Sequence, residues 1–267
     1  FRKQTKNLKQ KDMIDFSNNF YKQPHLHLVF KTEKDCQAFN KGFVKTSKCS
    51  GFLDHKGSIE DIPYFKDGKW WIQDFSSFFP LSNIVNFKSK YKFIDFCAAP
   101  GGKSFQILKH NKSIVLNDKN SSRINKLKEN LKRLNFKAKI NNYDVLNYNL
   151  QEKFDFVILD APCSSIGTVR KNPEIFFKDN HPDVNKLSEL QLKLLNKAGY
   201  HLKDGGYIIY MVCSFLENET RKVVNNFLKK NKNFLLSSFK IDGENSYYNY
   251  LVNNKYIEIL PSALFER

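Results

Sequence analysis

Two cysteines follow long apolar runs of the chain, and one of them lies close to a carboxylate. Cys163 comes three residues after Asp160, which ends the run 154–159, and Cys213 follows the run 206–212. Both runs have the length and composition of buried strands in a parallel sheet, whose carboxyl ends meet at one edge. A thiolate is a soft, strong nucleophile and a good leaving group, which suits attack on a base ring. A single cysteine is more often an inert small hydrophobe, but a pair at strand ends beside a carboxylate predicts chemistry.

A turn of small residues follows an earlier apolar run, 92–96. The turn reads Cys97-Ala98-Ala99-Pro100-Gly101-Gly102-Lys103, and a helical pattern begins after it. Two glycines let a ligand approach the backbone closely, and the end of a strand in an open α/β sheet is where nucleotide-like ligands bind. The turn matches neither GxGxxG nor GxxxxGK[ST], so it predicts an adenosine ligand other than a dinucleotide or a P-loop nucleotide.

Acidic residues follow the next two predicted strands. Asp118 ends the run 113–117, and by analogy with dinucleotide folds it is placed to accept hydrogen bonds from a ribose diol. The alternative for Asp118 is a helix N-cap. Asp144 could face an adenine amino group or be a turn residue.

From about residue 90 onward, apolar strands alternate with amphipathic helices. This pattern predicts a doubly wound, mostly parallel sheet, which would position the residues named above. A helix over 121–134 carries one apolar face, formed by Ile124, Leu127, Leu131 and Leu134. A second helix precedes the run 206–212 and is marked by Leu187, Leu190, Leu194 and Ala198. Residues 257–260 are predicted to form a late edge strand.

The first third of the chain has a different pattern. Residues 1–24 are polar and lysine-rich, which predicts a linker or short helix. Short apolar runs between 25 and 72, with a helix-like segment over 36–43, predict a small α+β unit that presents the substrate. We therefore divide the chain into 1–24, a small α+β unit over 25–85, and an α/β domain over 86–267.

The composition points to an acidic partner. The chain of 267 residues has 44 Lys+Arg against 27 Asp+Glu and a net charge of +17, as expected of a nucleic-acid binder. An AT-rich genome also encodes many lysines and asparagines, so the positive charge is explained either by nucleic-acid binding or by the base composition of the genome. Five cysteines without a CxxC pair predict neither a disulfide framework nor a zinc site, and no other metal site is expected. No run approaches the roughly 18 to 20 apolar residues of a spanning helix, so we expect a cytoplasmic protein without membrane contact.

Three segments make a family resemblance specific. They read FIDFCAAPGGKS, ILDAPCSSIGTVRKNPEI and YMVCSFLENE, and in this order they resemble motifs I, IV and VI of the RsmB/Nop2/Sun family of RNA cytosine-5 methyltransferases. The upstream FKDGKWWIQDFSS resembles the segment that leads into that family's domain. The likeness covers residues 64–219.

The resemblance implies a class I, Rossmann-like methyltransferase with a small N-terminal α+β subdomain. It further implies S-adenosylmethionine as cofactor, carbon 5 of a cytosine in RNA as the target, ribosomal RNA as the substrate class, and a monomer. The turn from Cys97 to Lys103 would wrap the cofactor, Asp118 would hold its ribose, and Asp144 its adenine region. Asp160 would lie between the methyl donor and the target.

The resemblance also implies catalytic roles. Cys213 would attack carbon 6 of cytosine, Cys163 would assist release of the product, and Asp160 would hydrogen bond toward ring nitrogen 3. The base must be flipped out of its stack, with Arg170 and Lys171 holding phosphates. The sequence departs from the family at Val212, where Thr is usual, and at Lys171, where a second Arg is usual.

Two other functions stay open. In a DNA cytosine-5 methyltransferase the thiol of Pro162-Cys163 would be the nucleophile, and such an enzyme does not need Cys213. A non-catalytic ribosome-assembly factor would keep the fold and the basic surface as an RNA-binding platform, and failure to bind the cofactor would favour it.

Overall fold

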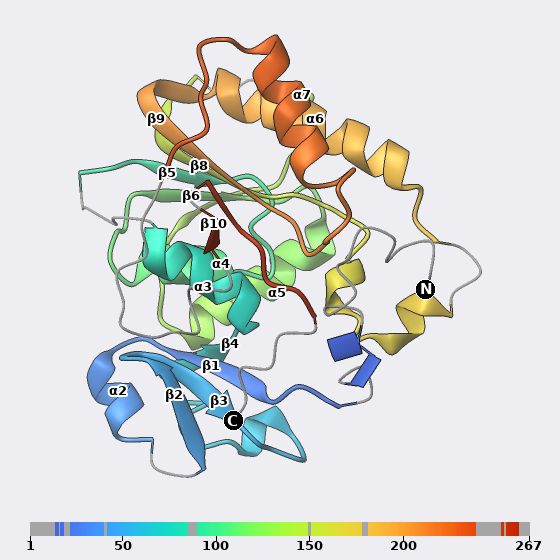
Figure 1. The fold of residues 1–267 in the computed structure, drawn as a ribbon. Helices are drawn as coiled ribbons and strands as arrows, with labels where there is room; N and C mark the ends of the chain where they lie inside the picture. The colour runs from blue at the N-terminus through green and yellow to red at the C-terminus, as the bar shows by residue number, and fades with distance from the viewer. Residues whose placement is uncertain are drawn as a thin grey trace.

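The protein contains two main sheets that lie one above the other (Figure 1). The computed structural model describes residues 14, 15, 17, 18, 22–39, 42–84, 90–148, 151–177, 181–238, 252, 253 and 255–261. Most of the predicted linker over 1–24 lies outside the described residues. Among the described residues, no helix is both long and apolar enough to cross a membrane.

The first sheet is antiparallel and has four strands in the order β2-β3-β1-β4. The strands are β1 (Leu26–Phe30), β2 (Phe43–Ser47), β3 (Ser50–Leu53) and β4 (Trp70–Ile72), accompanied by the short helix α2 (Glu33–Gln37) and the 3-10 turn η1 (Ile59–Asp61).

The helix predicted over 36–43 is wrong in its second half. The helix α2 ends at Gln37, and Phe43 begins β2. Cys36, Phe39 and Phe43 nevertheless pack in the same apolar cluster, where both phenylalanine rings contact Phe30. The spacings of three and four residues therefore resemble one face of a helix, although the residues come from α2 and β2, which pack into the same core.

The second sheet is parallel and has five strands in the order β7-β6-β5-β8-β9. The strands are β5 (Phe93–Asp95), β6 (Ile114–Asn117), β7 (Lys139–Asn141), β8 (Phe154–Asp160) and β9 (Leu202–Met211). The predicted strands over 92–96, 113–117, 154–159 and 206–212 are confirmed. The chain runs outward from β5 to β7 and then crosses to β8, so the strand order reverses between β5 and β8, where ligands of such sheets bind.

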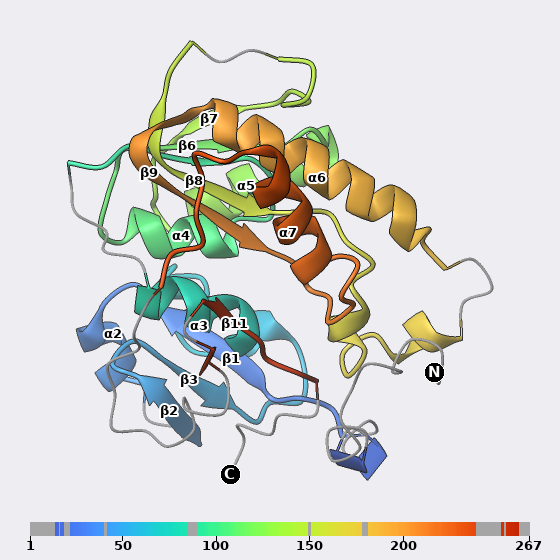
Figure 2. The same cartoon turned by 45° about the horizontal axis from the view of Figure 1, so that its top comes forward.

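Helices cover both faces of the parallel sheet (Figures 1 and 2). On one face lie α4 (Gly102–Leu108) and α5 (Ser121–Arg133), and on the other lie α6 (Val184–Tyr200) and α7 (Arg221–Lys230). The apolar face predicted for α5 is confirmed, because Ile124, Leu127 and Leu131 are buried against the sheet. The fold is therefore the predicted doubly wound α/β arrangement.

A chain of buried amides joins the two sheets. The helix α3 (Phe75–Ile84) follows β4 and lies between the sheets (Figure 2). Trp71 Nε1 donates to Gln73 Oε1 at 3.0 Å, and Gln73 Nε2 donates to Gln106 Oε1 in α4 at 2.7 Å. Gln106 Nε2 then donates to the carbonyl of Phe78 in α3 at 3.0 Å. These contacts fix the antiparallel sheet against the helix that follows the glycine turn.

The predicted edge strand over 257–260 is only partly confirmed. The hairpin β10 (Val252–Asn253) and β11 (Tyr256–Ile257) forms a separate two-stranded sheet and does not extend the parallel one. Ile257 and Ile259 instead pack against Phe52, Phe75 and Phe79. Apolar residues at the end of the chain therefore cover α3 and β3.

Candidate active site

Each parallel strand brings predicted site residues to the carboxyl edge of the sheet. Asp144 follows β7, Asp118 follows β6, the turn 97–103 follows β5, Asp160 ends β8, and Cys213 follows β9. We call residues 95–103, Asp118 and Asp144 the cofactor half. The remaining part, formed by Asp160, Cys163, Gly167, Cys213 and Glu219, is the reaction half.

The glycine turn is set by its own backbone. Gly101 has a φ of +118°, and a Cβ there would overlap the ring of Phe105, so only glycine fits. Asp95 accepts hydrogen bonds from Cys97 N at 3.2 Å and from Ser104 Oγ at 2.6 Å. Burial raises the pKa of Asp95 to about 7. This carboxyl group therefore links Cys97, at the start of the turn, to Ser104, just after it.

Asp118 is buried at the end of β6, only 2% exposed. Its carboxylate accepts from Ala99 N at 3.2 Å and from Asn120 N at 3.0 Å, and it lies 3.4 Å from Arg123 Nη1. The N-cap of α5 is Asn120, whose side chain accepts from Arg123 N. The alternative of Asp118 as a helix cap is therefore wrong.

Asp144 has a turn function in the structure. Its Oδ1 accepts from Leu146 N at 3.0 Å, as the turn alternative predicts. The preceding segment is tied to the neighbouring strand end, because Asn142 Nδ2 donates to the carbonyl of Asp118 at 2.7 Å. Asp118 and Asp144 thus belong to neighbouring strand ends that are hydrogen-bonded to each other.

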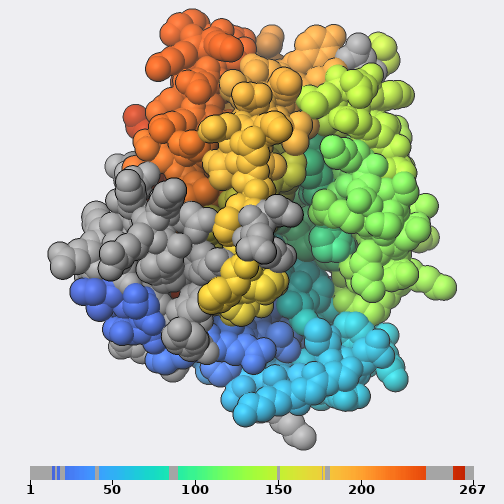
Figure 3. All heavy atoms as spheres, turned by 90° about the vertical axis from the view of Figure 1, so that its right-hand side faces the viewer, coloured from blue at the N-terminus to red at the C-terminus, as the bar shows by residue number. Residues whose placement is uncertain are grey.

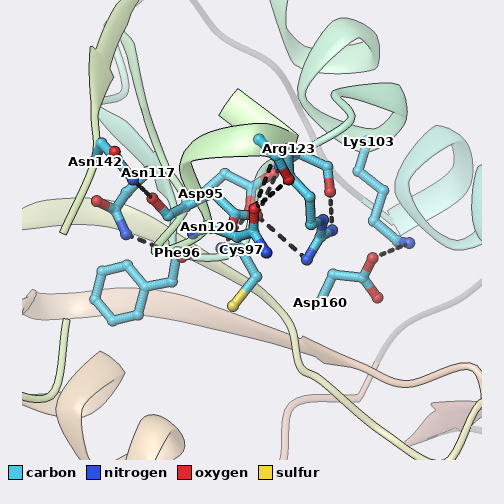
Figure 4. A network of polar contacts seen from close by, with 12 residues as sticks. Asp95, Phe96, Cys97, Lys103, Asn117, Asn120, Arg123, Asn142 and Asp160 are labelled. Atoms are coloured by element: carbon cyan, nitrogen blue, oxygen red, sulfur yellow. Dashed lines mark hydrogen bonds and ion pairs between the residues drawn. The ribbon is translucent and has the colours of Figure 1, made fainter. Parts of the chain in front are cut away.

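Lys103 reaches from the glycine turn into the reaction half. Its Nζ lies 2.7 Å from Asp160 Oδ2, and the two side chains are 10% and 29% exposed (Figure 4). Burial opposes the charge of Lys103, but Asp160 and the nearby Cys213 outweigh it, so the pKa of Lys103 is raised and the ammonium persists. The sequence assigns Lys103 to the cofactor-binding turn, whereas in the structure its ammonium group pairs with Asp160.

The loops that carry the two predicted thiols are joined, because Ser164 Oγ donates to Ser214 Oγ at 3.4 Å. The hydrogen bond from Cys213 lowers the pKa of Cys163, and the same hydrogen bond, together with the charge of Asp160, raises the pKa of Cys213. Gly167 fixes the second thiol, because its N–H donates to the carbonyl of Cys213 at 3.0 Å. A Cβ on Gly167 would lie 3.0 Å from that carbonyl oxygen, so a larger residue would push the backbone of Cys213 by a few tenths of an ångström.

Glu219 lies fully buried behind the thiol pair. Its carboxylate accepts from Ser164 N at 2.8 Å, Ser164 Oγ at 2.5 Å and Gln191 Nε2 at 3.1 Å. The sequence assigned no role to Glu219, although it stands in the third resembling segment. Its place six residues after Cys213 was the only signal, and nothing in the sequence predicts its burial.

The two predicted phosphate contacts lie at the joint between the sheets. They belong to the segment with η2 (Ile166–Thr168) and η3 (Pro173–Phe176), drawn in yellow in Figure 3 between α6 and the antiparallel sheet. Lys171 Nζ pairs with Asp74 Oδ2 at 2.6 Å, and Arg170 Nη2 donates to the carbonyl of Lys22 at 3.4 Å. Lys171 therefore holds the two sheets together in this structure.

A groove of about 1330 Å³ runs from the reaction half to the joint between the two sheets. Its lining includes Lys103, Asp160 and Cys213 from the parallel sheet, with Arg170 and Lys171 between them and the antiparallel sheet. The groove is therefore open to a large substrate at the reaction half.

The parallel sheet, its strand order and the acidic residues and thiols at its carboxyl edge define a class I methyltransferase. The family model for 16S rRNA methyltransferase RsmB/F matches residues 83–263. A probable ribosomal RNA small subunit methyltransferase B from Coxiella burnetii is 33% identical over 202 residues, which are 72% of this chain and 46% of that protein. The ribosomal RNA small subunit methyltransferase B of Enterobacter sp. is 33% identical over 208 residues, 72% of this chain and 48% of that protein.

The fold has solved counterparts. The crystal structure of NSun6 from Pyrococcus horikoshii with SFG superposes with a TM-score of 0.74 at 16% identity, over 85% of this chain and 86% of that one. The chain belongs to the RsmB/F family of ribosomal RNA methyltransferases. It spans about half the length of the curated relatives that it matches.

Membership of this family makes S-adenosylmethionine the cofactor. The residues present fit it. A glycine turn without room for side chains lies between carboxylates on adjacent strand ends, Asp118 on one side and Asp160 on the other. Carboxylates accept from ribose hydroxyls and amino groups and favour a cationic sulfonium, so this donor and acceptor set suits the cofactor.

Proposed function

We propose that this chain methylates carbon 5 of cytosine in RNA, with ribosomal RNA as substrate class, through a covalent adduct on Cys213. The observation that carries the proposal is that two thiol-bearing loops, joined by Ser164 Oγ and Ser214 Oγ at 3.4 Å, meet beside the Lys103–Asp160 pair at the sheet edge. A reaction that adds a thiol to a base ring and later removes it uses two acid/base groups at one place. The names of the relatives support ribosomal RNA.

Cys213 is the proposed nucleophile because it is exposed at the groove. Its thiolate adds to carbon 6 of the cytosine, which makes carbon 5 nucleophilic. The ammonium of Lys103 stabilises the thiolate before attack. Asp160 faces ring nitrogen 3 and stabilises the charge that develops there, an effect that is strongest in a preorganised site.

The bound cofactor supplies an electrophilic methyl group to carbon 5. The turn 97–103 and Asp118 orient it, and Asp144 contacts its adenine region. After transfer, the proton on carbon 5 passes to a base, the electron pair of that C–H bond restores the double bond between carbons 5 and 6, and Cys213 leaves as a thiolate. Cys163 hydrogen bonds to Cys213 and assists its release.

The RNA lies in the groove with its target base flipped toward Cys213. Arg170 contacts phosphate, and Lys171 does so where the RNA displaces Asp74. The small α+β unit over 25–85 presents the RNA, and residues 86–267 form the catalytic domain. Residues 1–24 form a linker or short helix before the α+β unit. The protein acts as a cytoplasmic monomer without membrane contact.

One observation favours the DNA-type assignment of the nucleophile. The hydrogen bond within the pair lowers the pKa of Cys163, so Cys163 is the sulfur that loses its proton first at rest. The roles of the two thiols therefore need a direct test.

The test uses three variants: Cys163→Ala, Cys213→Ala and, as control, Cys49→Ala in the antiparallel sheet. Each is incubated with S-adenosylmethionine and unmodified cellular RNA, or with DNA, and read on a denaturing gel. We expect a slow-migrating RNA adduct to accumulate only in Cys163→Ala, because release is blocked there. An adduct in Cys213→Ala would reverse the roles, an adduct only with DNA would favour the DNA enzyme, and absence of both adduct and cofactor binding would favour an assembly factor.

A further inference from the structure

Glu219 is a buried carboxylate that the proposed mechanism does not use. It lies in the segment between β9 and α7 and is fully shielded from solvent. A buried carboxylate is costly unless it accepts several hydrogen bonds. Glu219 accepts three, and two of them come from Ser164, the residue next to Cys163.

These bonds join the loops that carry the two thiols. Ser164 lies on the loop after β8, whereas Glu219 continues the segment that contains Cys213. Ser164 Oγ also lies 3.4 Å from Ser214 Oγ, and Tyr210 OH donates to the carbonyl of Glu219 at 2.6 Å. The contact between the thiols therefore depends on a carboxylate behind them.

Charges of opposite sign flank the pair. Lys103 faces Cys213, and Glu219 faces Cys163. The other ionisable groups that face the pair from packed elements are Asp160, next to Cys213, and Tyr210 in β9. Asp95 interacts electrostatically with Lys103 and Asp160, and through them with Cys213.

We propose that Glu219 is the positioning residue of the thiol pair and that its charge favours transfer of the shared proton from Cys213 to Cys163. In this step the S–H bond of Cys213 breaks, an S–H bond forms on Cys163, and the negative charge moves to Cys213 beside Lys103. The inference rests on the proposed function: the charge of Glu219 gives the exposed thiol a larger share of the thiolate than it would have without this carboxylate, although Cys163 is the stronger acid at rest.

The test measures how alkylation divides between the two thiols, without RNA or cofactor. The folded chain is treated with limiting iodoacetamide at pH 7, and initial rates at Cys163 and Cys213 are read by peptide mass spectrometry. Glu219→Gln keeps the shape of the side chain and removes its charge. Glu217→Gln is the matched control, since Glu217 is partly exposed two residues away, 3.9 Å from Lys222.

We expect the ratio of Cys213 to Cys163 alkylation to fall about tenfold in Glu219→Gln and to stay unchanged in Glu217→Gln. The pH profile of Cys163 alkylation should move to lower pH, because the thiolate there no longer faces a carboxylate. A purely structural role would change both rates together and leave the ratio constant, which would overturn the proposal.

A second variant keeps the proposal testable if Glu219→Gln does not fold. Glu219→Asp retains the charge but withdraws it from Ser164 by one methylene, and we expect a ratio about threefold lower than in the wild type. An unchanged ratio in the folded Asp variant would contradict the proposal. Because alkylation needs no substrate, this outcome is independent of whether RNA is methylated.

Discussion

The two halves of the site edge are held by different kinds of contact. In the cofactor half, main-chain N–H groups hold the carboxylates: Ala99 N and Asn120 N bind Asp118, and Leu146 N binds Asp144. In the reaction half, side chains from separate elements hold one another, as in the pair between Asp160 at the end of β8 and Lys103, which reaches across from α4. A local turn sequence can specify the first arrangement, whereas the second requires the whole sheet. Variants should therefore separate cofactor affinity from the chemical step.

The largest effect is expected from Asp160→Asn. Because the carboxylate pairs with Lys103 and, in the proposed mechanism, faces the target base, we expect kcat to fall about 10²- to 10³-fold. Cofactor affinity, measured by calorimetry, should change much less. Asp155→Asn is the control, since Asp155 lies on the same strand and pairs with Lys203 far from the thiols. Equal losses in cofactor affinity and in kcat would contradict the division of the site into a cofactor half and a reaction half.

Gly167→Ala tests how closely the reaction half is packed. The new Cβ would press on the carbonyl of Cys213, and a displacement of the thiol by a fraction of an ångström to one ångström lowers the rate about 10²-fold. Gly205→Ala is the matched control. Gly205 has a φ of +72° and open space around it, so Ala there strains the backbone without touching the site. Activity equal in both variants, measured at equal fraction folded, would contradict the role of Gly167.

Asp118→Asn should give the opposite pattern from Asp160→Asn. The amide keeps one acceptor for the backbone but loses the charge that favours ribose hydroxyls. We expect cofactor binding to weaken about tenfold, with kcat at saturating cofactor changed less than about twofold. Calorimetry and steady-state rates check the two quantities, and Asp67→Asn, exposed in the antiparallel unit, serves as control. A fall in kcat with unchanged affinity would move Asp118 into the reaction half.

The difference between the halves also explains what the sequence could predict. The strands predicted over 92–96, 113–117, 154–159 and 206–212 and the helix α5 follow from apolar periodicity and are confirmed, and the ends of these strands bring the predicted site residues to one edge of the sheet. The helix predicted through Phe43 failed because Phe39 and Phe43 share a core from two elements. The burial of Glu219 and the direction of Lys103 depend on side chains brought together across the sheet, which no local pattern encodes.

The smallest effect concerns Lys171, which the sequence predicts as a phosphate contact and the structure pairs with Asp74. The two side chains are 38% and 43% exposed, so solvent screens the pair. A double-mutant cycle with Asp74→Asn and Lys171→Gln should give a coupling of only about 0.5 kcal/mol in the free energy of unfolding.

The same variants decide between the two roles of Lys171. If RNA phosphate competes with Asp74 for the ammonium, Asp74→Asn lowers the KM for RNA, because Lys171 no longer has to be released, and raised salt reduces the difference. Arg170→Gln, one residue away, should raise the KM in either case. A KM that rises in Asp74→Asn would show instead that the ion pair holds the antiparallel sheet in the position that RNA requires, so that the joint between the sheets, rather than a free basic side chain, contributes to substrate binding.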